Sequence, residues 1–131
     1  MKTYSVIVRG RRPWTVNQER KKGAHYERSN ITKWWREAFC EAALEAGIPH
    51  FDSITIEITP ILPDRRMQDT GACFPTAKAA IDGLVDAGVI DDDAPQYVPT
   101  IVFHAPVICS EGGLEILIIP EPKNLCGKAN M

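Results

Sequence analysis

The sequence predicts a single α+β domain in which helices pack on a small mixed sheet. Its length of 131 residues is enough for one domain with a modest core. Short segments with alternating apolar residues, typical of strands, are interspersed with two segments whose apolar residues recur every three or four positions, as in helices. In chain order, these segments predict the arrangement β-α-β-α-β-β.

Four strands are predicted from composition and period. The first covers residues 4–8, which are mainly β-branched and aromatic. The second covers residues 54–59, where three isoleucines alternate with polar residues and would face the core together. Residues 97–103 and 114–119 are predicted as two further strands, with two adjacent glycines in the connection between them.

A first helix is predicted over residues 31–46. Asn30 is a suitable N-cap, and Gly47 is a suitable residue to end the helix. Trp34 and Trp35 both belong to its apolar stripe. Tryptophan can stack on nucleobases, but we expect at least one of the two side chains to be buried in the core.

A second helix is predicted over residues 75–87, because Pro75 suits a first helical turn and Gly88 suits a helix end. One side of this helix is apolar and would face the core. The opposite side carries Lys78, Asp82 and Asp86.

The remaining segments are predicted as loops. Residues 9–30 are basic and polar without a clear period, and so long a loop in a small domain is usually functional or disordered. Residues 60–74 form a second loop that is rich in proline, glycine and charge. The domain would cover residues 1–120, followed by an irregular tail at residues 121–131.

Several classes of protein are disfavoured. Because no apolar stretch is long enough to cross a bilayer and the N-terminus has no apolar leader, we expect a cytoplasmic protein with no membrane partner. The cysteines have no zinc-binding spacing and are expected to be free thiols. They are Cys40, Cys73, Cys109 and Cys126.

The net charge of −2 conceals a strong asymmetry. Residues 1–36 contain ten lysines and arginines but only two glutamates, whereas acidic residues dominate the rest of the chain. A chain divided in this way can present one surface to phosphates and another to a cation. The alternative for the basic run at residues 20–22 is a merely solvated loop.

Acidic residues occur on both sides of the second helix. Asp69 precedes it, and the run at residues 91–93 follows it. The end of the second strand and the start of the third could bring these two loops together at one edge of the sheet. Such oxygen ligands suit Mg²⁺, and the cations Arg65, Arg66 and Lys78 could hold a phosphate beside it. The alternative is a solvated acidic turn.

These residues carry a resemblance to a known family. The sequence PDRRMQD at residues 63–69 resembles the segment that leads into the first catalytic aspartate of the RusA-like Holliday-junction resolvases. Residues 78–90 resemble the K-x-x-x-D-x-L-x-x-A-G helix of that family, and Asp92 with Asp93 matches its D-D pair. The sequence PWTVN at residues 13–17 is similar to its P-x-S-x-N motif.

The resemblance covers residues 3–119 and implies a RusA-like fold and a homodimeric crossover-junction endodeoxyribonuclease. Such phage and prophage enzymes act in DNA recombination and repair, and they cut four-way branched DNA. They require Mg²⁺, for which Mn²⁺ can substitute. The resemblance places this activity in the host cytoplasm. By position, the catalytic residues would be Asp69, Lys78 and Asp93, and the metal ligands Asp69, Asp92 and Asp93. The DNA-binding residues would be Arg11, Arg12, Asn17, Arg20, Lys21, Lys22, Arg65 and Arg66.

The sequence departs from the family pattern at one point. Family members usually read D-x-D-N, whereas this chain has Asp69, Thr70, Gly71 and Ala72, with three extra residues before Lys78. Three hypotheses therefore stay open. In the first, the chain is an active nuclease in which Asp91 or Asp92 replaces the missing acid. In the second, it binds branched DNA but has a weakened or inactive centre. In the third, it is a phage protein-interaction module with an acidic surface turn.

Overall fold

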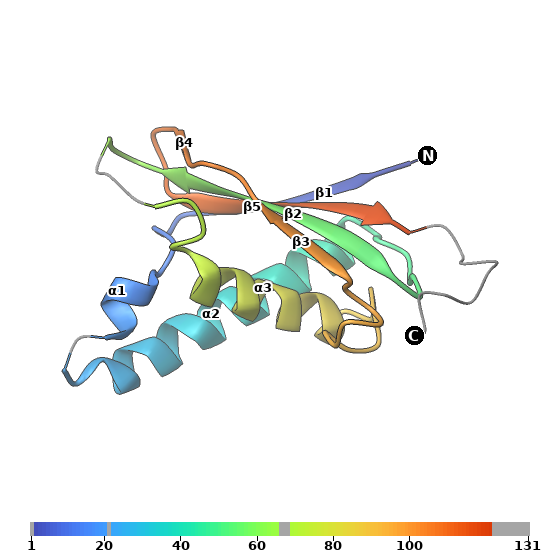
Figure 1. Cartoon of the computed structure of the whole chain (residues 1–131), viewed down its shortest axis with the longest axis horizontal. Helices are drawn as coiled ribbons and strands as arrows, with labels where there is room; N and C mark the ends of the chain where they lie inside the picture. The colour runs from blue at the N-terminus through green and yellow to red at the C-terminus, as the bar shows by residue number, and fades with distance from the viewer. Residues whose placement is uncertain (1, 21, 66–68, 122–131) are drawn as a thin grey trace.

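The computed structural model describes residues 2–20, 22–65 and 69–121. A mixed sheet forms one layer, and the helices lie together on one of its faces (Figure 1). This arrangement confirms the predicted α+β class. The elements are β1 (Tyr4–Arg9), α1 (Val16–Glu19), α2 (Ala24–Glu45), β2 (Ile54–Leu62), α3 (Phe74–Asp86), β3 (Thr100–Phe103), β4 (Val107–Ile108) and β5 (Gly113–Pro120).

The strand order is β1-β5-β2-β3, and β4 also pairs with β2. β5 is antiparallel to both of its neighbours, whereas β3 and β4 run parallel to β2. β2 contains Pro60, which has no N–H to donate. The sheet tolerates it because the pairing with β3 ends at Ile58 and the pairing with β4 begins at Ile61, so no strand needs the missing donor.

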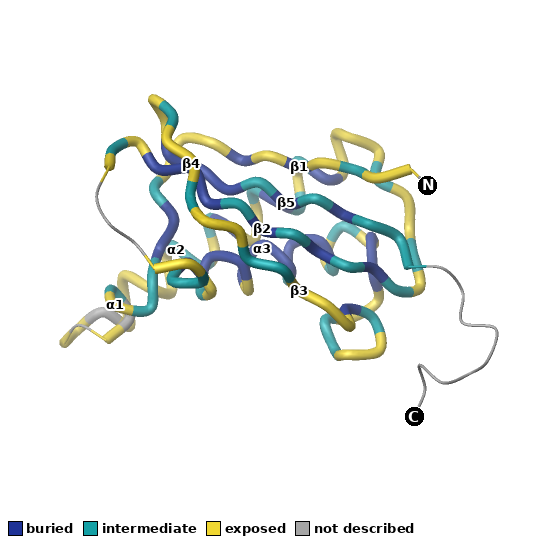
Figure 2. Tube along the Cα trace, turned by 45° about the horizontal axis from the view of Figure 1, so that its top comes forward, coloured by how far each residue is buried: buried dark blue, intermediate teal, exposed yellow. Residues whose placement is uncertain are grey.

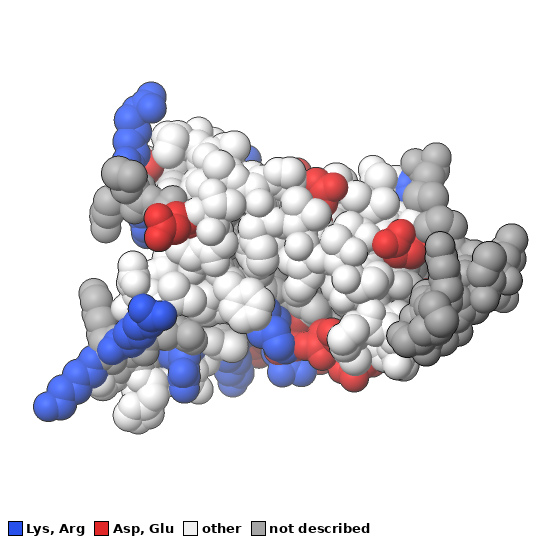
Figure 3. All heavy atoms as spheres, in the orientation of Figure 1, with Lys and Arg blue, Asp and Glu red and all other residues white. Residues whose placement is uncertain are grey.

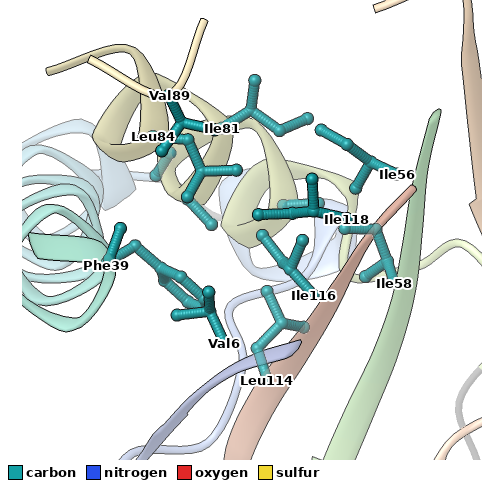
Figure 4. Packing of buried hydrophobic residues seen from close by; sticks show 14 of the residues in the cluster. Val6, Phe39, Ile56, Ile58, Ile81, Leu84, Val89, Leu114, Ile116 and Ile118 are labelled. Carbon is teal, nitrogen blue, oxygen red and sulfur yellow. The ribbon is translucent and has the colours of Figure 1, made fainter. Parts of the chain in front are cut away.

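The core lies between the sheet and the helices α2 and α3. Alternate residues of β2 and β5 point toward the helices, and α3 presents its apolar side to them (Figure 4). Trp35 and Phe39 of α2 are fully buried, which confirms that at least one of the paired tryptophans is a core residue. Figure 2 shows that the beginning of α2, by contrast, is exposed.

α2 and α3 approach each other closely at Gly83. A β-carbon at this position would lie 2.4 Å from the backbone oxygen of Arg36. At the edge of the same contact, Arg36 donates two hydrogen bonds to the carboxylate of Asp86, at 2.6 and 2.9 Å. Glycine therefore allows the two helices to pack backbone against backbone, and the ion pair bridges them at the surface.

The prediction of one long loop over residues 9–30 is wrong. A short helix, α1, lies within it, and α2 begins seven residues before the predicted start. Asn30 is consequently inside α2 rather than its N-cap, which is Gly23. All side chains from His25 to Asn30 are exposed. An apolar period reports contact with a core, so a helical segment that contacts none has no such period.

Two other boundaries differ from the prediction. The loop predicted at residues 60–74 begins later, because β2 continues to Leu62. The third strand begins at Thr100 rather than Tyr97, because the backbone N–H groups of Tyr97 and Val98 both bond to the carbonyl of Ala94 and form a turn. Within the described residues, no helix has the length and apolar character needed to cross a membrane.

Candidate active site and DNA-binding surface

Lys78 is the centre of a charged cluster on the exposed side of α3. Its ammonium group donates a hydrogen bond to Asp82 Oδ1 at 2.8 Å and another to Asp93 Oδ2 at 2.5 Å. Lys78 and Asp82 are four residues apart, so they lie on the same side of the helix. Asp93 comes from the segment that follows α3, so this pair depends on the tertiary fold.

The hydrogen bond between Lys78 and Asp93 stabilises the charged form of both side chains. Although partial burial lowers the pKa of Lys78, its hydrogen bonds to Asp82 and Asp93 outweigh that effect and raise the pKa above its ordinary value. The hydrogen bond from Lys78 lowers the pKa of the Asp93 carboxyl below its ordinary value, although burial opposes this change. At neutral pH, Lys78 is therefore a cation and Asp93 an anion. Neither is suited to exchanging protons, but both are suited to binding charged groups.

Local contacts hold the acidic turn in place. The backbone N–H of Asp93 donates a 2.8 Å hydrogen bond to Asp92 Oδ1, so the Asp92 carboxylate is held against the backbone of the turn. His50 contacts Asp91 Oδ1 at 3.0 Å and connects the turn to the segment before β2. Val98, which is buried, anchors the other end of the turn in the core. This segment therefore returns alongside α3 and brings Asp93 to Lys78.

The strand arrangement that was expected to bring the two acidic loops together at one edge of the sheet is not the one observed. β2 and β3 are parallel, with Thr55 opposite Thr100, so the end of β2 and the start of β3 lie at opposite ends of the strand pair. Asp69 lies before the first turn of α3 and is exposed. Within the described residues, no side-chain contact joins it to Lys78. Its role as a catalytic residue and metal ligand stays a prediction.

The structure tests how well the acidic residues suit a divalent cation. No group of three histidine, cysteine, aspartate or glutamate side chains in the described ranges is arranged to hold a metal. The implied set of Asp69, Asp92 and Asp93 does not form such a group in the described residues, and its binding of a metal stays a prediction. The adjacent carboxylates Asp92 and Asp93 nevertheless suit the chemistry of Mg²⁺, which is commonly bound by one or two carboxylates and several waters.

The segment before α1 docks beside the start of α3. Thr76, which is buried, donates a 2.8 Å hydrogen bond from Oγ1 to the carbonyl of Trp14, and the N–H of Val16 donates to the carbonyl of Ala72 at 3.1 Å. The indole of Trp14 is itself buried. The motif at residues 13–17 is thus next to the segment that contains Asp69, although some fifty residues separate them in sequence.

The predicted DNA-binding residues fall into two groups. Some have protein partners: Arg12 pairs with Asp64 at 3.2 Å, and the guanidinium of Arg11 lies 4.9 Å from the ring centre of Trp34. Others have exposed side chains that make no hydrogen bond or ion pair with any part of the chain that the structure describes. These are Asn17, Arg20, Lys22 and Arg65. Lys21 and Arg66 lie outside the described residues.

The exposed cations gather at one end of the molecule. Figure 3 shows Lys and Arg side chains over α1 and the beginning of α2, at the lower left. Along the lower margin of the same view, basic side chains meet acidic ones over the helices. We call this surface the basic arm; it is formed by Arg20, Lys22 and the exposed start of α2.

Gly71 stands where the D-x-D-N pattern has its second aspartate, and the backbone at this position does not suit that residue. Its φ is +90°, a conformation that residues with a side chain rarely adopt. We expect Gly71→Asp to lose about 1–2 kcal/mol of stability through backbone strain and to gain no cutting activity. Urea unfolding and junction-cutting rates of wild type, Gly71→Asp and Gly71→Ala would check this. Faster cutting by Gly71→Asp alone would contradict it.

Sequence reasoning missed three features of this site. Asp82 was placed on the exposed face of its helix but not recognised as a partner of Lys78. The i, i+4 spacing of the two residues could have indicated it. The contact between Thr76 and Trp14 and the contact between His50 and Asp91 join distant segments, and no local pattern signals them. No family model matches the sequence, and no curated protein matches it.

Proposed function

We propose that this chain is a Mg²⁺-dependent, structure-specific endonuclease of the RusA-like kind that cuts four-way or related branched DNA. One observation carries the proposal: Lys78 joins Asp82 and Asp93 in an exposed cluster, Asp92 lies beside Asp93 in the chain, and the same molecule carries an exposed basic arm. Phosphodiester cleavage needs such a combination of a phosphate-binding cation and oxygen ligands for a metal.

The residues have separate roles in this proposal. Asp92 and Asp93 would hold the cation, which supplies an activated water and stabilises charge on the phosphate oxygens. Lys78 is 48% exposed in its side chain and uses two of its three N–H donors on carboxylates. The third donor is available for a phosphate oxygen. Because its pKa is raised, Lys78 stays charged throughout the physiological pH range.

The proposal is tested by incubating the protein with a synthetic four-way junction and with a linear duplex of the same sequence, with and without Mg²⁺ or Mn²⁺. Cutting of the junction alone, and only with metal, supports the proposal. Because a four-way junction presents two equivalent strands, we expect a two-fold homodimer, which sedimentation of the same samples would reveal. A monomer that neither binds nor cuts the junction would refute the proposal.

A second candidate function is binding of branched DNA without cutting. It is favoured by the position of Asp69, which makes no contact with the Lys78 cluster in the described residues, and by the absence there of a three-ligand group. A retarded junction complex that remains uncut at all metal concentrations would support this alternative. A failure to bind DNA at all would instead favour a protein-interaction module.

The basic arm is expected to contribute much of the affinity for DNA. Because the side chains of Arg20 and Lys22 make no hydrogen bond or ion pair within the described ranges, their charges are available to phosphates and would release condensed counterions on binding. We expect Arg20→Ala with Lys22→Ala to reduce the slope of log affinity against log salt by about 2. Binding titrations from low to high salt measure this slope. Lys2→Ala, a basic residue before β1, is the matched control, and an unchanged slope in the double variant would remove the arm from the interface.

A further inference from the structure

An exposed aromatic ring lies one helical turn before Lys78. Phe74 begins α3 and remains 47% exposed, which is unusual for a phenylalanine so close to the core. Its ring packs against that of Phe103 at the end of β3, with the ring centres 6.2 Å apart and the planes inclined by 56°. One part of the ring thus has a rigid support, and another part is open to a ligand.

The ring and the charged cluster share one side of α3. Phe74, Lys78 and Asp82 follow one another at intervals of four residues, which places them in a row on an α-helix. The backbone N–H of Phe74 also donates to the carbonyl of Gly71 at 3.1 Å. The ring is therefore held in a fixed relation both to Lys78 and to the turn that follows Asp69.

The chemistry of this row suits a nucleotide whose base is not paired. A half-exposed aromatic ring offers a flat apolar surface on which any nucleobase can stack. The neighbouring ammonium group offers a contact for the phosphate of the same or the next nucleotide. A stacking ring and a cation one helical turn apart offer separate contacts for the base and for the phosphate of a single strand.

We propose that Phe74 stacks on an unpaired nucleobase beside the phosphate that Lys78 binds, and that this contact discriminates branched DNA from duplex DNA. The inference rests on the proposed function and deepens it. In an intact duplex, every base is stacked on its neighbours, so the ring has no free partner. At a branch point, bases can leave the stack at a lower cost, and the ring can accept one.

The test uses Phe74→Leu, which keeps an apolar side chain against Phe103 but removes the aromatic face, and Phe74→Tyr, which keeps that face. Leu44→Ala is the control, because Leu44 is also exposed but lies at the far end of α2. Each full-length protein is titrated with a four-way junction that carries 2-aminopurine at the branch point, and with the matching duplex. Fluorescence of 2-aminopurine reports stacking of the substituted base.

Phe74→Leu should bind the junction about 5- to 50-fold more weakly, in line with the loss of one base–aromatic stack. It should also lose the fluorescence change at the branch point while keeping the affinity of wild type for the duplex. Phe74→Tyr and Leu44→Ala should behave as wild type. If Phe74→Leu gives the affinity and the fluorescence change of wild type, the inference is overturned while the proposed function stands.

Two other outcomes also decide the question. If wild type does not prefer the junction to the duplex, both the proposed function and this inference are overturned. If Phe74→Leu instead becomes a monomer in sedimentation while wild type is a dimer, Phe74 belongs to an interface between copies and not to the DNA surface. That outcome overturns the inference as well.

Discussion

Replacing Asp93 by asparagine is expected to abolish the cutting of four-way junctions. The change preserves the size of the side chain and its ability to accept a hydrogen bond from Lys78, but it removes the negative charge that attracts the metal. Loss of a catalytic carboxylate lowers reaction rates by about a thousand-fold or more. Single-turnover cutting at increasing Mg²⁺ concentrations measures this loss.

Binding should survive in the Asp93→Asn variant, because the phosphate contacts come from lysines and arginines elsewhere and one repulsive charge is removed. Asp86→Asn is the matched control. Asp86 is the last residue of α3 and forms an ion pair with a basic residue, Arg36, but it lies outside the Lys78 cluster. It should cut at nearly the rate of wild type. If Asp93→Asn cuts as fast as wild type, this assignment of the active site is wrong.

Replacing Gly83 by alanine is expected to destabilise the whole domain. The new β-carbon would lie 2.4 Å from the carbonyl oxygen of Arg36 and 3.1 Å from the backbone nitrogen of Cys40. Because both atoms belong to the backbone of α2, neither can rotate away, and the two helices must separate. We expect a loss of about 2–4 kcal/mol, a large part of the stability of a typical domain.

The direction of the stability change in Gly83→Ala distinguishes a crowded site from an open one. At an unhindered helical position, alanine stabilises a protein by up to about 1 kcal/mol relative to glycine. Urea unfolding measures the free energy of unfolding, and an unchanged denaturant slope would show that the unfolded state is unaffected. Ser29→Ala, at an exposed position of α2, is the control and should change stability little. A Gly83→Ala protein as stable as wild type would show that α2 and α3 do not pack as closely as described.

The Lys78 cluster shows how far sequence reasoning reaches. The apolar period placed residues 75–87 in a helix and put Lys78 and Asp82 on its exposed side, as the structure confirms. Their contact follows from helix geometry alone. The contact between Lys78 and Asp93 could not be derived in this way, because it depends on the turn after α3 and on the burial of Val98.

The sequence by itself determined the α+β class, the buried faces of β2 and α3, and the division of the chain into a basic beginning and an acidic remainder. These properties follow from local periodicity and composition, which each segment carries independently of its neighbours. Only the tertiary structure decided that Trp14 docks on Thr76, that Phe74 is supported by Phe103, and that α2 begins at Ala24. Contacts between distant segments, and helical turns that lie outside the core, leave no periodic trace in the sequence.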